Sequence, residues 1–210
     1  AYGDVRARAR DGRAAPGHAG GMAHDGGMTT MLPPWPERPL VGERVALRRA
    51  DARDAPMARS LSADPYVPAI GSLPPEATDE QARAWIARQR DSRDRGAGFS
   101  FTIVDRRADA AVGNCGLWLR ELAEGRASAG YAIAPEHRRA GLAADALRTL
   151  TAFAAAVPGL HRVELYIEPW NTGSLRTADA AGFTREGLLH SHQWIGGERR
   201  DMVLCARILH

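Results

Sequence analysis

From about residue 40 onward, apolar residues follow two different spacings along the chain. In 99–103, large apolar side chains occupy every second position, which is typical of a half-buried strand. In 142–157 they recur every three to four positions, as on one face of a helix. These patterns predict strands near 45–48, 99–103, 111–119, 126–134, 163–167, 186–195 and 199–208, and helices near 54–62, 76–95, 142–157 and 172–181.

Strands and helices alternate in this order, which predicts an α/β fold with a mixed sheet of about seven strands and about four flanking helices. The strand–helix–strand unit within 126–167 predicts two parallel strands, because such a crossover normally joins parallel neighbours. The stretch Asp64–Pro75 contains four prolines and one glycine, and we expect it to be a loop.

The first residues have a different composition. Ala1–Thr30 is rich in glycine, alanine, arginine and histidine and has few large apolar side chains, so we expect a flexible tail and no signal peptide. Whether this part is native is left open. A proline-rich linker follows, in which Trp35 is a candidate anchor onto the domain. We therefore divide the chain into a tail with linker (1–39) and one folded domain (40–210).

Amino-acid composition excludes several classes of function. The chain has 28 basic and 25 acidic residues, and this small excess does not indicate a nucleic-acid partner. Every basic residue is arginine, which excludes a lysine Schiff base. Cys115 and Cys205 lie in separate apolar runs, and we expect buried, reduced thiols and a cytoplasmic location. No apolar run approaches the roughly 18 residues of a membrane span.

The most informative segment is the basic turn between the strand near 126–134 and the helix near 142–157. Such a turn leaves unpaired N–H groups at a helix N-terminus, which attracts phosphate, and small residues such as Gly141 allow close approach of an anion. The turn matches neither a Walker loop nor a G-x-G-x-x-G fingerprint, and no H-E-x-x-H, C-x-x-C or G-x-S-x-G occurs. We therefore expect no metal site and no serine nucleophile.

Arg138–Ala143 reads R-x-x-G-x-A, which resembles the pyrophosphate-binding signature of the GNAT superfamily of acyl-CoA N-acyltransferases. Gly130–Arg138 and the segments Glu168–Ser174 and Ala181–Phe183 resemble the branch that includes ribosomal-protein N-terminal acetyltransferases. The resemblance extends loosely over residues 40–209. It implies the GNAT fold and transfer of an acyl group, most simply acetyl, from acyl-CoA to a primary amine by direct attack in a ternary complex.

The same resemblance assigns the donor site. The strand end pairs with the pantetheine arm, a backbone N–H near Ile133 polarises the thioester carbonyl, and the turn holds the diphosphate with the help of Arg138 or Arg139. Asn171 contacts the pantetheine arm, although an ordinary N-cap role is equally compatible with it. The expected residues are Ile133, Ala134, Arg138, Arg139, Ala140, Gly141, Leu142, Ala143, Asn171 and Ser174.

Two departures from the family pattern concern proton transfer. Many members carry a tyrosine seven residues after the asparagine, where this chain has Ala178. In the branch that it resembles, the serine at the position of Ser174 protonates the leaving thiolate. Some members have a carboxylate where this chain has Gln193, so Glu168 is the best remaining candidate for the base, through water. These departures also keep open an alternative, a non-catalytic acyl-CoA-binding sensor or interaction domain.

The acceptor is less defined. It could be a protein N-terminus or a small amine, and a longer donor such as succinyl-CoA stays open. We expect the acceptor pocket to involve the loop Tyr66–Leu73, the helix containing Trp85, and Trp118. A homodimer is compatible with the resemblance, and the oligomeric state is not readable from the sequence.

Overall fold

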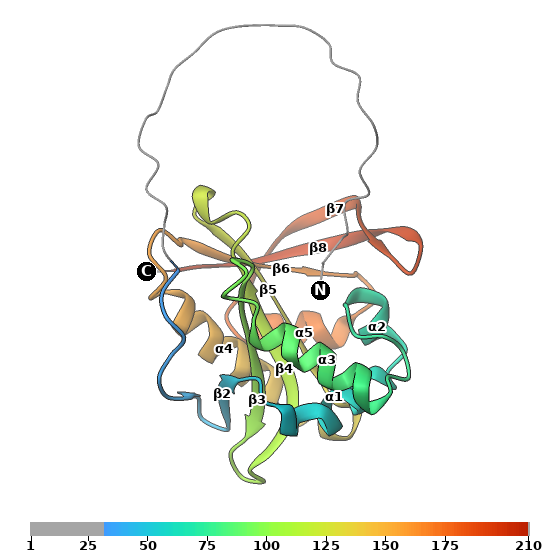
Figure 1. Cartoon of the computed structure of the whole chain (residues 1–210). Coiled ribbons are helices and arrows are strands. Elements are labelled where there is room, and N and C mark those ends of the chain that lie inside the picture. The colour runs from blue at the N-terminus through green and yellow to red at the C-terminus, as the bar shows by residue number, and fades with distance from the viewer. Residues whose placement is uncertain (1–31, 210) are drawn as a thin grey trace, which may run out of the picture.

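The computed structural model describes residues 32–209, which form one mixed β-sheet with helices on both faces (Figure 1). The strands are β1 (Leu40–Val41), β2 (Val45–Arg49), β3 (Gly98–Asp105), β4 (Ala110–Trp118), β5 (Arg126–Ile133), β6 (Arg162–Ile167), β7 (Thr184–Ile195) and β8 (Glu198–Ile208). The helices are α1 (Ala55–Ser62), α2 (Tyr66–Ile70), α3 (Asp79–Arg90), α4 (Leu142–Ala154) and α5 (Thr172–Ala180).

The strands lie in the order β1-β2-β3-β4-β5-β6-β8-β7, and every neighbouring pair is antiparallel except β5 and β6. The expected α/β sheet and its parallel pair are confirmed. The described residues contain eight strands instead of about seven because β1, at two residues, is too short to show a period.

A fifth helix, α2, lies inside the expected proline-rich loop. Asp64 starts it by accepting the N–H groups of Tyr66 and Val67 at 2.8 and 3.0 Å. Pro68 falls in the first turn, where a missing N–H costs no helical hydrogen bond. The loop predicted from the proline content of Asp64–Pro75 is therefore wrong for Tyr66–Ile70, which form a short helix.

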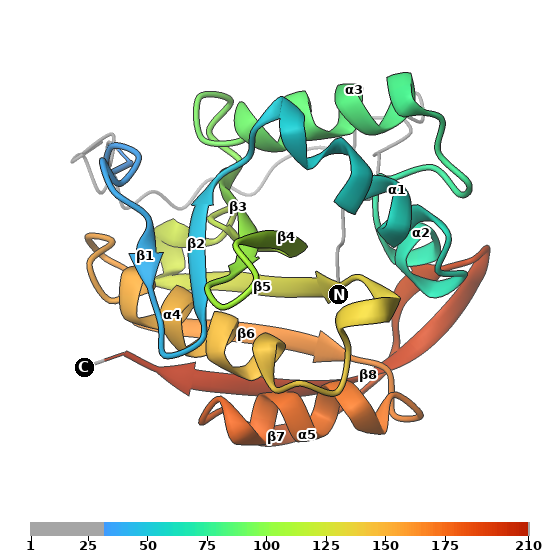
Figure 2. The same ribbon diagram turned by 90° about the horizontal axis from the view of Figure 1, so that it is seen from below.

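The helices form two layers around the sheet. Figure 2 shows α1 and α3 on one side of the strands and α4 and α5 on the other. Strand β5 contributes to both layers by alternation: Ile133 packs in the cluster with α4 and α5, whereas Ala132 and Ala134 pack in the cluster with α1 and α3. The buried strand in the middle is thus fixed by apolar contacts on both faces.

Several local expectations are confirmed. Cys115 and Cys205 are buried and free. Gly182 ends α5 with a φ of +81°, the left-handed conformation expected of a helix C-terminus. Trp35 packs edge-on against Phe99 and Phe101, with ring centroids 5.3 and 5.2 Å away. The expected tail, residues 1–30, lies outside the described part of the chain. No helix within residues 32–209 is both long and apolar enough to cross a membrane.

The two halves of the sheet are joined by little backbone pairing. Strand β5 pairs with β6 only through Arg126–Ser128, opposite Arg162–Glu164. Beyond these three pairs the strands diverge, and β6 continues with β8 and β7 as a separate wing (Figure 1). The remainder of β5 therefore has a ladder partner, β4, on one edge only.

The N-terminus of α4 is anchored from the side by a buried carboxylate. Asp145, in the first turn, accepts N–H groups of Arg44 and Val45 at 2.8 and 3.0 Å, and that of Glu43 at 3.4 Å. Burial acts to raise the pKa of Asp145, but the hydrogen bonds from these backbone groups outweigh it and hold the pKa below its ordinary value. Asp145 thus ties the β1–β2 turn to the start of α4.

Replacing this carboxylate should cost stability at neutral pH. The lowered pKa means that the charged form stabilises the fold above about pH 4, and that this contribution is lost as pH falls through the folded-state pKa. We expect Asp145→Asn to lower the free energy of unfolding by about 1–3 kcal/mol at pH 7, with the gap from wild type narrowing below about pH 4. Urea denaturation between pH 3 and 7 measures this.

The matched control is Asp94→Asn. The Asp94 side chain is 53% exposed and takes part only in surface ion pairs among the described residues. We expect a change within about 0.5 kcal/mol. Equal losses in the two variants, or a gap for Asp145→Asn that does not depend on pH, would contradict this role of the buried carboxylate.

Candidate active site

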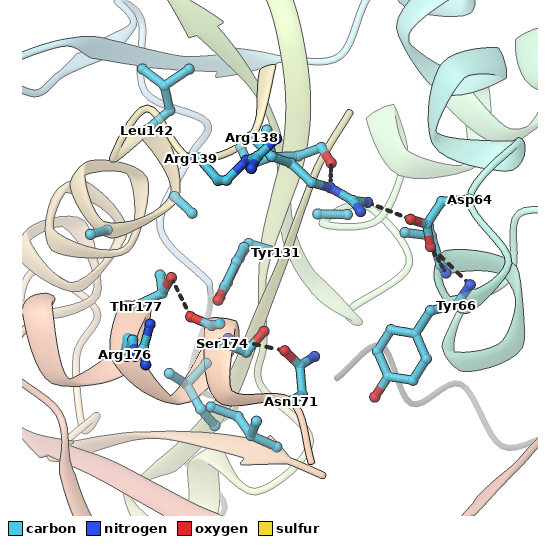
Figure 3. A pocket seen from close by; sticks show the side chains of 18 of the residues that line it. Asp64, Tyr66, Tyr131, Arg138, Arg139, Leu142, Asn171, Ser174, Arg176 and Thr177 are labelled. Atoms are coloured by element: carbon cyan, nitrogen blue, oxygen red, sulfur yellow. Dashed lines mark hydrogen bonds and ion pairs between the residues drawn. The ribbon is translucent and has the colours of Figure 1, made fainter. Parts of the chain in front are cut away.

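A pocket of about 650 Å³ opens where β5 and β6 separate. Its walls come from α2, the end of β5, the turn before α4, strand β6 and the start of α5 (Figure 3). Nine of the expected site residues line it: Ile133, Arg138, Arg139, Ala140, Gly141, Leu142, Ala143, Asn171 and Ser174. Ala134 is buried at the end of β5, and Glu168 also lies behind the wall.

The free edge of β5 forms one side of this pocket. The N–H of Ala134 donates to Val112 on β4 at 2.9 Å. Because N–H groups point alternately to the two edges of an antiparallel strand, those of Ile133 and Tyr131 point away from β4, toward the divergence. An extended ligand could therefore pair with this edge as a further strand would.

The turn before α4 supplies a second set of backbone donors. Gly141 is the N-cap residue, with a φ of +76°, and has no side chain to satisfy the first N–H groups of the helix. Arg139 also has a positive φ, +62°. Arg44 holds the turn from below through a hydrogen bond to the Ala140 carbonyl. The result is a fixed bend at the positive end of a helix, which suits an anionic group.

Arg138 is engaged across the pocket rather than free in it. Its Nε donates to the Ile133 carbonyl at 2.9 Å, and its Nη2 lies 2.7 Å from Asp64 Oδ2 (Figure 3). Burial acts to raise the pKa of Asp64, but hydrogen bonds from Val67, Arg138 and Tyr66 bring it below its usual value. One guanidinium therefore links the end of β5 to the start of α2.

The start of α5 faces the same pocket. Asn171 accepts the N–H of Ser174 at 3.0 Å, so it is the N-cap of α5 and a lining residue at once. Thr177, one turn along, donates its hydroxyl to the Gly173 carbonyl at 2.9 Å. Ala178 is buried and offers no polar group.

Tyr131 projects between these elements from β5. Its hydroxyl oxygen is buried and has no hydrogen-bond partner among residues 32–209. Burial raises the pKa of this phenol, and the neighbouring hydroxyls of Ser174 and Thr177 counteract part of that effect. In the sequence, Tyr131 occupies an alternating strand position that is typical of a core tyrosine, and such a position gives no signal for an unpaired hydroxyl.

Glu168 lies next to Tyr66, on the side of the pocket formed by α2. The residue is only 4% exposed. Burial, and then the adjacent Glu168 carboxylate, raises the pKa of the Tyr66 phenol well above its ordinary value. The Tyr66 ring packs edge-on against Trp170, with centroids 5.0 Å apart. Glu168 can therefore reach the pocket only by way of Tyr66 or of a water molecule.

Two strand histidines near the pocket do not line it. His190 pairs with Asp201 at 2.9 Å, and the ring of His192 stacks on the lining residue Tyr166 with centroids 4.9 Å apart. Of the expected acceptor-side residues, Tyr66, Val67 and Ile70 line the large pocket, whereas Trp85 is buried and borders a much smaller hollow.

Comparison with known proteins finds N-acetyltransferases. An uncharacterized N-acetyltransferase, p20, from Bacillus licheniformis is 29% identical over 165 residues, which cover 79% of this chain and 93% of p20. The ribosomal-protein-S5-alanine acetyltransferase of Vibrio fischeri superposes with a TM-score of 0.66 at 19% identity, over 82% of this chain and 97% of that chain.

A third match is RimL, a ribosomal L7/L12 α-N-protein acetyltransferase solved with coenzyme A. It gives a TM-score of 0.67 at 19% identity, over 82% of this chain and 98% of that chain. At these identities both structures show the shared fold alone. The profile of the acetyltransferase (GNAT) domain family matches residues 44–184, about two thirds of the chain. The chain therefore belongs to the GNAT acetyltransferase family and is, by that membership, an acyl-CoA-dependent N-acetyltransferase.

Proposed function

We propose that this enzyme transfers an acetyl group from acetyl-CoA directly to a primary amine while both substrates are bound. The observation that carries the proposal is the divergence of β5 and β6 after three residue pairs, next to the exposed N-terminus of α4. Together they offer strand-like pairing for an amide-rich arm and backbone donors for a diphosphate, on adjoining walls of one pocket. Coenzyme A contains both chemical groups.

At the donor end, the diphosphate is assigned to the backbone amides of Arg139–Ala143, with Arg139 as the side-chain cation. Arg138 has a different part in this scheme, because its guanidinium is already held by Ile133 and Asp64. The outward N–H groups of Ile133 and Tyr131 are the candidates to polarise the thioester carbonyl, as in an oxyanion hole.

At the acceptor end, the amine enters beside Tyr66 and Trp170, and Glu168 takes up its proton by way of Tyr66 or water. An α-amino group, with a pKa of about 8, costs roughly 1.4 kcal/mol to deprotonate at pH 7, whereas lysine costs roughly 4.6 kcal/mol. A weakly connected base therefore favours α-amines. A protein N-terminus or a small α-amine is the acceptor that we propose, in keeping with the ribosomal-protein acetyltransferases among the structural relatives.

The direct test combines calorimetry with acetyl-CoA and an assay of free thiol release against a panel of amines. We expect micromolar binding of acetyl-CoA and turnover with at least one α-amine. Binding without turnover across the panel would contradict the transferase proposal and favour an acyl-CoA sensor. Absence of acetyl-CoA binding would contradict the proposed donor site.

The bend at Gly141 should be needed for donor binding. A Cβ at this position meets no atom within 4 Å, so Gly141→Ala costs only the strain of a positive φ, about 1–2 kcal/mol. We expect acetyl-CoA affinity to fall about tenfold as the bend relaxes, measured by calorimetry.

Gly159 provides the matched control, since it has nearly the same φ, +77°, and the same open surroundings in the loop between α4 and β6. Gly159→Ala should lose similar stability and keep its affinity for acetyl-CoA. If both variants bind acetyl-CoA equally, the bend at Gly141 is not part of the donor site.

Ser174→Ala tests the proton transfer to the leaving group. We expect kcat to fall at least tenfold while KM for acetyl-CoA changes less than twofold, because the hydroxyl acts when the C–S bond breaks rather than when the donor binds. The Asn171 cap is made to the backbone N–H of Ser174 and survives the change. Steady-state kinetics with the best amine measures this, and an unchanged kcat would reject the role.

A further inference from the structure

The buried hydroxyl of Tyr131 is the feature of the pocket that packing does not explain. A phenylalanine would fill the same space without leaving a polar atom unpaired, and buried polar groups in folded proteins almost always have partners. Among residues 32–209 this oxygen has none, although Tyr131 lines the candidate active-site pocket. A hydroxyl without a partner is suited to hydrogen-bond an atom of a bound ligand or to transfer a proton in catalysis.

The position of Tyr131 on β5 brings its side chain close to the path that we propose for the donor. Tyr131 and Ile133 lie on the same face of β5, about 7 Å apart along the strand. Both have outward N–H groups on the edge left free by β6. If the pantetheine arm follows this edge inward from the turn at Gly141, its sulfur end comes to Tyr131. The phenol then lies beneath the bond that has to break.

Its neighbours supply a path. The hydroxyls of Ser174 and Thr177 lie beside the Tyr131 phenol, and Figure 3 shows all three side chains converging from β5 and α5. Thr177 donates its own proton to the Gly173 carbonyl and so has none to pass on, and neither hydroxyl is hydrogen-bonded to Tyr131 in this structure. A serine hydroxyl can accept one proton and donate another, which leaves Ser174 as the group able to relay.

We infer that Tyr131 is the proton source for the leaving group and that Ser174 is the relay, a mechanism that rests on the proposed acetyl transfer. As the tetrahedral adduct collapses, the C–S bond breaks and its electron pair stays on sulfur. Sulfur takes the proton of the Ser174 hydroxyl while Ser174 takes that of Tyr131. The tyrosinate regains a proton, through water, from the base that deprotonated the amine. The proton lost by nitrogen thus equals the one gained by sulfur.

The relative acidities of a phenol and an aliphatic hydroxyl suit Tyr131 as the proton source and Ser174 as the relay. A phenol, with a pKa near 10, is a far stronger acid than an aliphatic hydroxyl and lies closer to an alkyl thiol, near 8.5. Burial raises the pKa of Tyr131, so the phenol is protonated when the thiolate forms but is a weaker acid than a solvent-exposed tyrosine, and the transfer depends on the return of a proton from the base. The position that carries a tyrosine in many relatives is Ala178 here, on α5, and the phenol from β5 takes over its task.

The test is a double-mutant cycle of Tyr131→Phe and Ser174→Ala, assayed for kcat and for KM of acetyl-CoA. We expect each single variant to lose about 10- to 100-fold in kcat with KM within twofold, and the double variant to be no worse than the poorer single one, because members of one relay act as a unit. Losses that multiply would overturn the relay. A Tyr131→Phe kcat within twofold of wild type would overturn the role of Tyr131.

Thermal unfolding separates this from a structural role. Tyr131→Phe removes a hydroxyl without a partner, so the melting temperature should stay or rise. Tyr166→Phe is the matched control, since it removes a hydroxyl bonded to Glu164 at 2.6 Å and should lower the melting temperature. A wild-type enzyme that binds no acetyl-CoA, or acetylates no amine, defeats the proposed function itself. A fully active Tyr131→Phe variant defeats only this inference.

Discussion

The site depends on the shortness of one parallel pairing. Only Arg126–Ser128 pair with β6, so the rest of β5 keeps hydrogen-bonding groups that no strand satisfies. Exposed edges of this kind usually invite aggregation, and proteins cover them or keep them short. Here the edge is set inside a pocket, between α2, α4 and α5. The unsatisfied groups are thereby kept for a ligand rather than for another chain.

Such a divergence persists only if both sides are held independently. On one side, β5 is paired with β4 over six residues and packed on both faces. On the other, β6 is paired with β8 from end to end. The turn at the pocket mouth is fixed by Asp145, which ties α4 to the β1–β2 turn, and by Arg44 below Ala140. Closing the gap would break contacts in both halves of the sheet.

The sequence was sufficient for the parts of this arrangement that are local. Alternation located the strands, helical spacing located α4, and the basic turn at 138–143 marked the N-terminus of that helix. It could not show the contacts between distant segments. Arg138 meets Asp64 from 74 positions away, and nothing local distinguishes a solvated arginine from a linking one. The same holds for Tyr131, whose unpaired hydroxyl is defined by what surrounds it rather than by the pattern it belongs to.

Arg138 connects the strand edge proposed for the donor with the helix proposed for the acceptor side. Its Nε is fixed by the carbonyl of Ile133, at the edge proposed for the donor, while Nη2 holds Asp64, which starts the helix carrying Tyr66. The planar fork of arginine can direct two donors to different partners, whereas a lysine presents its donors from a single point. A shift of α2 must therefore be transmitted to the strand edge that we propose for the thioester. Since a displacement near 1 Å can cost about a hundredfold in rate, this link is worth more for alignment than for the charge it could have lent to a diphosphate.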